Sequence, residues 1–113
     1  MHELSIAMEI LRIIENDISN KQSKKVTEIE LDIGQMAGVD IGNLRFVLEN
    51  ISSQALFDGC RIHINTIQPL SHCNLCGAVF PVRNLFESCA VCHSSDVRLV
   101  CGNELKIKSY VIE

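Results

Sequence analysis

Two pairs of closely spaced cysteines constrain the fold of this chain more than any other feature. Each pair has the spacing C-x2-C, and the pairs are Cys73 with Cys76 and Cys89 with Cys92. Thiolates so spaced on a tight turn can reach one ion, and two such turns supply the four sulfurs of a tetrahedral zinc site. Gly77 follows the first pair, where a tight turn favours a residue that tolerates positive φ. The spacing predicts a metal site, with zinc as the first interpretation and an iron–sulfur cluster or two disulfides as alternatives.

The cysteines lie in a segment that is too small to fold alone. Residues 70–101 contain both pairs, and pieces below about 40 residues generally need a metal or disulfides. A structural zinc supplies about 10–16 kcal/mol of binding free energy in small modules, and this energy appears as folding free energy. We therefore expect a zinc-binding module at 70–101, and a separate domain formed by residues 1–69 and 102–113.

The rest of the chain alternates between helical and strand periodicity. Apolar residues recur at helical spacing over about 4–20 and 42–57, and they alternate with polar ones near 28–33, 61–67 and 105–111. The pattern predicts an α+β fold, a two-layer domain of three strands and two helices with an inserted zinc-ribbon-like module. A helix between the first two strands favours a parallel pair, and the direction of the third strand is open. The predicted apolar stripe of the first helix consists of Leu4, Ala7, Met8, Leu11, Ile14 and Ile18.

Charge and hydropathy narrow the class of protein. The net charge is -4 and the cysteine segment has no basic stripe, which argues against a nucleic-acid partner. Charged residues interrupt the first twenty positions, so no signal peptide is expected. No apolar run approaches the roughly 20 residues of a membrane span. We expect a cytoplasmic protein with no membrane partner, and in a reducing compartment six cysteines favour metal binding over disulfides.

The chain begins Met1-His2-Glu3, a second candidate metal site. A bulky second residue predicts that Met1 is retained, so that the terminal amine, the His2 amide and the His2 imidazole can close chelate rings around one ion. A planar set of nitrogens favours Ni(II) or Cu(II). The alternative is a solvated terminal histidine followed by an acid that interacts favourably with the helix dipole. The spacing alone leaves both interpretations open.

Further motifs run along the whole chain: Met1-His2-Glu3-Leu4-Ser5, Ile33-Gly34, Ala37-Gly38-Val39-Asp40, Leu44-Arg45-Phe46, the two cysteine pairs with Cys92-His93-Ser94, and Gly102-Asn103-Glu104-Leu105-Lys106-Ile107. Together they resemble the HypA/HybF family of nickel metallochaperones for hydrogenase maturation. The resemblance implies nickel, Ni(2+), at Met1, His2 and Glu3, and a structural zinc, Zn(2+), held by the four cysteines. It also implies delivery to the hydrogenase large subunit with a hydrogenase maturation GTPase, and, as in some relatives, a link to urease maturation factors. It implies no enzymatic activity.

Two other functions fit parts of the sequence. A zinc-ribbon binding module for nucleic acid or a protein partner could stack bases on Phe80 and Phe86, but the chain has few aromatic residues and no basic cluster. A zinc hydrolase would need an open coordination position, which four cysteines do not leave. The hypothesis of a metal-delivery protein is therefore preferred.

The remaining cysteines and histidines receive no assigned ligand role. His93, and more remotely His72, are candidate accessory residues of the zinc site, although we expect His93 to lie outside the coordination sphere. Cys60 and Cys101 are expected to be small buried hydrophobes, and His63 to lie on the solvent face of its strand. A homodimer formed by exchange of the last strand stays an open alternative.

Overall fold

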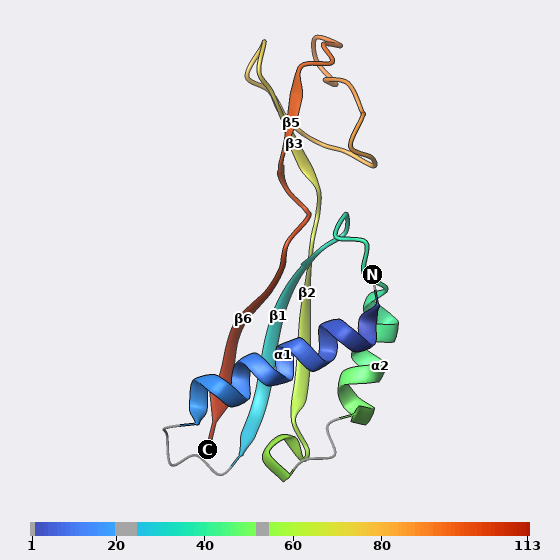
Figure 1. Cartoon of the computed structure of the whole chain (residues 1–113). Coiled ribbons are helices and arrows are strands. Elements are labelled where there is room, and N and C mark those ends of the chain that lie inside the picture. Colours follow the sequence, from blue (N-terminus) through green and yellow to red (C-terminus); the bar gives the residue numbers. More distant parts are fainter. Residues whose placement is uncertain (1, 20–24, 52–54) are drawn as a thin grey trace.

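The computed structural model describes residues 2–19, 25–51 and 55–113. The molecule is elongated, with principal extents of 55 × 25 × 17 Å, and its two three-stranded sheets follow one another along the long axis (Figure 1). No helix within these residues is long and apolar enough to cross a membrane. The elements in chain order are α1 (Glu3–Ile18), β1 (Val26–Gly34), α2 (Ile41–Ile51), the 3-10 helix η1 (Ala55–Phe57), β2 (Arg61–Ile67), β3 (Leu70–Cys73), β4 (Val79–Pro81), β5 (Val97–Cys101) and β6 (Leu105–Ile112).

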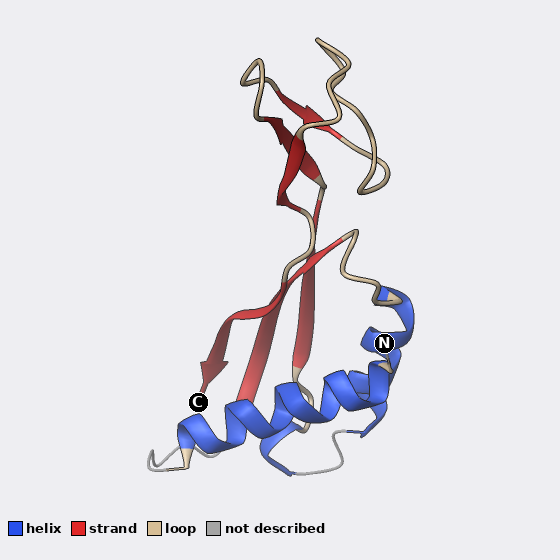
Figure 2. Ribbon diagram, turned by 45° about the horizontal axis from the view of Figure 1, so that its top comes forward, coloured by secondary structure: helices blue, strands red, loops and turns tan. Residues whose placement is uncertain are grey.

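The first sheet has the strand order β2-β1-β6. β1 and β2 are parallel, from Glu28 opposite Arg61 to Gly34 opposite Ile67, which confirms the predicted parallel pair. β6 runs antiparallel on the other side of β1. α1 crosses this sheet, and α2 packs against α1 and β2 (Figures 1 and 2). The predicted α+β fold of two helices on three strands is therefore confirmed.

The core of this layer lies between the helices and the sheet, but the predicted stripe of α1 is partly wrong. Leu4 and Met8 are 51% and 59% exposed, whereas Ile10 is buried. The helical period shows that a helix has an apolar face about 100° wide, but it does not fix the edges of that face to within one residue. The line along which α1 crosses the sheet decides which residues of that face are covered. The buried residues are Ala7, Ile10, Ile14, Ile18, Val26, Ile29, Leu31, Ile33, Leu44, Leu48, Phe57 and Ile62.

The second helix is shorter than predicted. α2 ends at Ile51, residues 52–54 lie outside the described part of the chain, and residues 55–57 form the separate 3-10 helix η1. The turn after it is closed by the Cys60 N–H, which donates to the Phe57 carbonyl at 3.1 Å. Phe57 is 2% exposed in the core. Its burial therefore fixes a turn that helical periodicity alone cannot distinguish from a continued helix.

The inserted segment forms the second sheet, with strand order β4-β3-β5 and antiparallel pairing throughout. Its strands are three to five residues long, too short for the alternation that indicates a strand in the sequence, and we did not predict them individually. Two connections join the sheets, one from β2 to β3 and one from β5 to β6 (Figure 1). The division into domains at residues 70 and 101 stays a prediction.

The junction between the sheets, which we call the waist, is held by backbone contacts. Gly34 and Gly102 pack so closely that a Cβ on Gly34 would overlap the Gly102 carbonyl. Gly102 has a φ of 110°, and a Cβ there would lie 2.6 Å from Pro69 Cβ. Three N–H groups at the end of β1 and just after it donate to carbonyls of the two neighbouring chain segments. They donate from Gly34 to Glu104 O at 2.8 Å, from Gln35 to Ile67 O at 3.0 Å and from Met36 to Gly102 O at 2.7 Å.

Candidate metal centres

The first cysteine pair lies on a tight turn that begins at the end of β3. The Gly77 N–H donates to the Cys73 carbonyl at 2.9 Å and closes the turn. The Cys76 N–H donates to Cys73 Sγ at 3.4 Å. Gly77 has a φ of 81°, in the left-handed region where a side chain is strained. The positive φ predicted for Gly77 is confirmed.

The second pair repeats this geometry with His93 in the place of Gly77. The His93 N–H donates to the Cys89 carbonyl at 3.0 Å, and the N–H groups of Cys92 and Val91 donate to Cys89 Sγ at 3.4 and 3.3 Å. His93 has a φ of 65°, and its side chain is exposed. The visible role of His93 is therefore to complete a turn in a conformation that costs a non-glycine residue about 1–2 kcal/mol.

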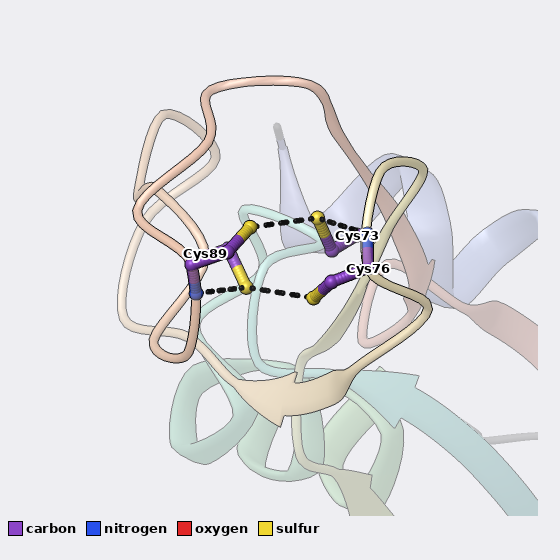
Figure 3. A group of neighbouring side chains, drawn as sticks. Cys73, Cys76 and Cys89 are labelled. Atoms are coloured by element: carbon purple, nitrogen blue, oxygen red, sulfur yellow. Dashed lines mark hydrogen bonds between the residues drawn. The ribbon is translucent and has the colours of Figure 1, made fainter.

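The two turns bring four sulfurs to one point. The Sγ atoms of the four paired cysteines lie within 4.8 Å of one another, and Figure 3 shows those of Cys73, Cys76 and Cys89 directed toward a common centre. The distances from Cys73 to Cys92 and from Cys76 to Cys89 are 3.6 Å, too long for a disulfide. Tetrahedral zinc with bonds of about 2.3 Å places its sulfurs about 3.8 Å apart. Both the donor set and the spacing fit zinc.

Backbone N–H groups also favour the ionised form of two of these thiols. The Cys76 N–H is the main cause of a lowered pKa at Cys73. The Cys92 N–H, with that of Val91, lowers the pKa of Cys89 to about 6. Thiolate is the form that binds zinc. Cys73 and Cys89 are buried beside Phe80 and Val82, whereas Cys76 and Cys92 are exposed at the rim.

The other cysteines and histidines lie outside this group of sulfurs. Cys60 and Cys101, which we expected to be small buried hydrophobes, are only half-buried, and Cys60 packs against the core of the first layer. Each directs its thiol at a neighbouring carbonyl, that of Arg61 for Cys60 and that of Gln68 for Cys101. His63 is 54% exposed beside Glu28 on the open face of the first sheet, as predicted. His72 is half-buried in β3.

The second candidate centre is at the start of α1, well away from the cysteine turns (Figure 1). Met1 lies outside the described residues. His2 is the N-cap residue of α1, with an extended backbone, an exposed side chain and no capping hydrogen bond from its imidazole. The first bond of the helix runs from the Ile6 N–H to the His2 carbonyl at 3.2 Å. The imidazole is thus not used to stabilise the helix.

The Glu3 carboxylate turns toward the beginning of α2, a contact that sequence reasoning did not find. It accepts hydrogen bonds from the Asn43 side-chain amide at 3.1 Å and from the Asp40 N–H at 3.4 Å. These bonds, with Asn43 contributing most, lower the pKa of Glu3. Asp40 and Asn43 are of residue types that commonly cap helices, but nothing in the sequence places them beside position 3.

Comparison with known proteins identifies the family. A family model described as hydrogenase/urease nickel incorporation, metallochaperone, hypA matches residues 1–112. The chain belongs to this family. Hydrogenase maturation factor HypA of Parabacteroides distasonis is 37% identical over 113 residues, which are all of this chain and 98% of that protein. The HypA of Chlorobaculum tepidum is 32% identical over the full length of both chains.

Two solved structures show the same fold. The solution structure of the nickel metallochaperone HypA from Helicobacter pylori has a TM-score of 0.66 and 24% identity, over 99% of this chain and 97% of that one. A second solution structure of a HypA protein has a TM-score of 0.74 and 23% identity, over 100% and 97%. HypA proteins are nickel metallochaperones and maturation factors, which is the function class expected from the sequence motifs.

Proposed function

We propose that this HypA-family chain binds Ni(II) through Met1, His2 and Glu3 and delivers it to the large subunit of a hydrogenase. The observation that carries the proposal is the placement of His2 in a chain of this family. Its imidazole is exposed and makes no capping bond. A ligand that is not used to hold the fold can bind an ion and release it while the fold stays intact.

The backbone at the start of α1 suits the same task. The first N–H groups of a helix have no intrahelical carbonyl to bond, and the first helical bond here uses the Ile6 N–H. Coordination by the amides of His2 and Glu3 therefore breaks no helical hydrogen bond. With the Met1 amine and the imidazole they offer a planar nitrogen set, which favours Ni(II). The exposed imidazole of His2 also lets a partner approach and replace this ligand.

We assign a structural zinc to Cys73, Cys76, Cys89 and Cys92. The buried apolar cluster of the second sheet contains Phe80, Val82 and two of these cysteines themselves. So small a cluster cannot offset the conformational entropy of ordering residues 70–101. Zinc bound to four thiolates supplies the missing free energy, and it leaves no open position for catalysis.

The partners follow from the delivery step. We propose a hydrogenase maturation GTPase and the hydrogenase large subunit, and, because the family description includes urease, urease maturation factors as a second set. We place the step in the cytoplasm, where a reducing environment keeps cysteines available for zinc.

The nickel assignment is tested by titrating the zinc-loaded protein with Ni(II) and comparing wild type with His2→Ala. We expect the variant to lose at least about tenfold in affinity, because it lacks one ligand of the chelate. His63→Ala removes another exposed imidazole, from the open face of the sheet, and serves as the matched control. Unchanged affinity in His2→Ala would refute the assignment.

The zinc assignment is tested by chelation followed by limited proteolysis and zinc analysis. We expect removal of the metal, or Cys73→Ser, to expose residues 70–101 to cleavage while the helices keep their circular dichroism. Full resistance of that segment after complete zinc removal would contradict a structural role.

A further inference from the structure

The side chain of Glu3 links the N-terminus to a distant part of the chain. Its Oε1 accepts from the Asn43 side-chain amide at 3.1 Å and its Oε2 from the Asp40 N–H at 3.4 Å. The contact joins the first residue of α1 to the first turn of α2. Because Glu3 directly follows His2, this contact acts on the residue next to the proposed imidazole ligand.

The groups that hold Glu3 are themselves fixed. The Asp40 carboxylate accepts from the Asn43 N–H at 3.1 Å, and its carbonyl accepts from the Leu44 N–H at 2.9 Å, so Asp40 caps α2. Leu44 is fully buried, and Val39 packs against the same core. Both donors to Glu3 therefore belong to a segment that is anchored in the core and hydrogen-bonded at the start of α2.

The charge of Glu3 suits this position. The carboxylate lies in the first turn of α1 and also accepts bonds at the N-terminal end of α2. A negative charge is favourable near the N-terminus of a helix, and here it lies near two. Asn43 supplies the shorter of the two bonds, and its own side chain is exposed, so its amide is available to hold Glu3 rather than to fill the core.

We propose that Asn43 is a positioning residue for the nickel-binding terminus. It acts through Glu3: by holding the carboxylate it fixes the backbone of residue 3, and so the direction in which Met1 and His2 present their nitrogens. Asn43 does not touch the metal. The inference rests on the proposed nickel site, and it predicts that a change at Asn43 alters nickel retention without changing the ligand set.

The test uses an exchange of donor and acceptor. Asn43→Asp removes the amide donor and places a second carboxylate beside that of Glu3. Helix α2 is preserved, because Asp is favourable in the first turn of a helix. The double variant Glu3→Gln with Asn43→Asp restores a hydrogen bond of reversed direction and the original net charge. Asn50→Asp makes the same chemical change on the same helix, where the side chain donates to the Phe46 carbonyl, and is the control.

Two readouts are taken on the full-length, zinc-loaded protein. The first is the rate of nickel loss to an excess of a colorimetric chelator, which we expect to be about three- to tenfold faster in Asn43→Asp. The second is the backbone order of Glu3 and Leu4 in the nickel-free protein, measured by 15N relaxation, which we expect to fall in Asn43→Asp. Both values should return toward wild type in the double variant and stay unchanged in Asn50→Asp.

The outcomes separate the positioning role from the nickel site itself. Wild-type nickel loss in Asn43→Asp, or a double variant as impaired as the single one, would overturn the positioning role while leaving the His2 result intact. Equal 15N order in wild type and Asn43→Asp would overturn it as well. Unchanged nickel affinity in His2→Ala would instead overturn the proposed site, whatever Asn43 does.

Discussion

The waist between the sheets gives the sharpest prediction about stability. Gly34→Ala adds one methyl group to the last residue of β1. That Cβ would lie closer to the Gly102 carbonyl and to the Asn103 nitrogen than real Cβ contacts do. All three neighbouring atoms belong to the backbone, and Gly34 is held on both sides, by pairing with Ile67 and by its N–H bond to Glu104. No side chain can rotate away, so β1 and the chain around Gly102 must separate.

The expected loss is about 3 kcal/mol. Overpacking typically costs about 1–3 kcal/mol, and a clash between paired backbones belongs at the upper end. The reduced entropy of the unfolded chain offsets only about 0.4–1 kcal/mol. A domain of this size is stable by roughly 5–15 kcal/mol, so the variant should stay folded and melt about 10 °C lower or more.

Two glycines provide controls for the same substitution. At Gly38, with φ 75°, a Cβ meets nothing within 4 Å. Gly38→Ala should therefore lower the free energy of unfolding by only about 1–2 kcal/mol, the cost of a non-glycine residue in a left-handed conformation. At Gly42, in the first turn of α2, the nearest atom is 3.6 Å away, and Gly42→Ala should stabilise by about 0.5–1 kcal/mol. The measurement is urea unfolding at constant zinc, followed by helical circular dichroism. A Gly34→Ala variant no less stable than Gly38→Ala would refute the reasoning from close contact.

Two further predictions concern His93 in the second cysteine turn and Tyr110, which is half-buried in β6. His93→Gly should relieve the strain of the left-handed backbone and slow the loss of zinc to a chelator by about threefold or more. His93→Val, whose side chain is β-branched, should speed the loss of zinc. Equal rates in wild type and both variants would contradict the strain. Tyr110, the only tyrosine in a chain without tryptophan, donates its hydroxyl to Asp17, and this bond to a carboxylate raises its pKa. The raised value means that the bond stabilises the fold below pH 10 and ceases to do so as pH rises through the folded-state pKa. Ultraviolet titration should therefore show a lower tyrosine pKa in Asp17→Asn, and identical titration curves would argue against the hydrogen bond.

Long periodic elements could be predicted from the sequence, whereas short ones could not. α1, β1, β2 and β6 each show many turns or alternations of their period, and the helix between β1 and β2 indicated their parallel pairing. β3 and β4 span only four and three residues, so their alternation is not distinguishable from chance. The exposure of Leu4 and burial of Ile10 depend on where α1 crosses the sheet, a tertiary property that a helical period does not contain.

The candidate sites divide in the same way. The four cysteines could be predicted to converge because C-x2-C pairs are local motifs whose turns form from their own backbone bonds. The placement of Glu3 beside Asn43 joins residues far apart in the chain, and only the packing of α1 against α2 brings them together. His93 was weighed as a ligand from its position after Cys92, but its equivalence to Gly77 becomes visible only when the two turns are compared.

The loop from Gly34 to Asp40 relates the two candidate centres to the rest of the molecule. At one end Met36 donates its N–H to the Gly102 carbonyl and packs its side chain against the buried cluster of the second sheet. At the other end the Asp40 N–H donates to Glu3. Between them Ala37 and Val39 pack against the core of the first layer. One short loop thus contacts the cysteine-bearing sheet, the main core and the N-terminal residues, and the clash expected at Gly34 acts directly on the segment that holds Glu3.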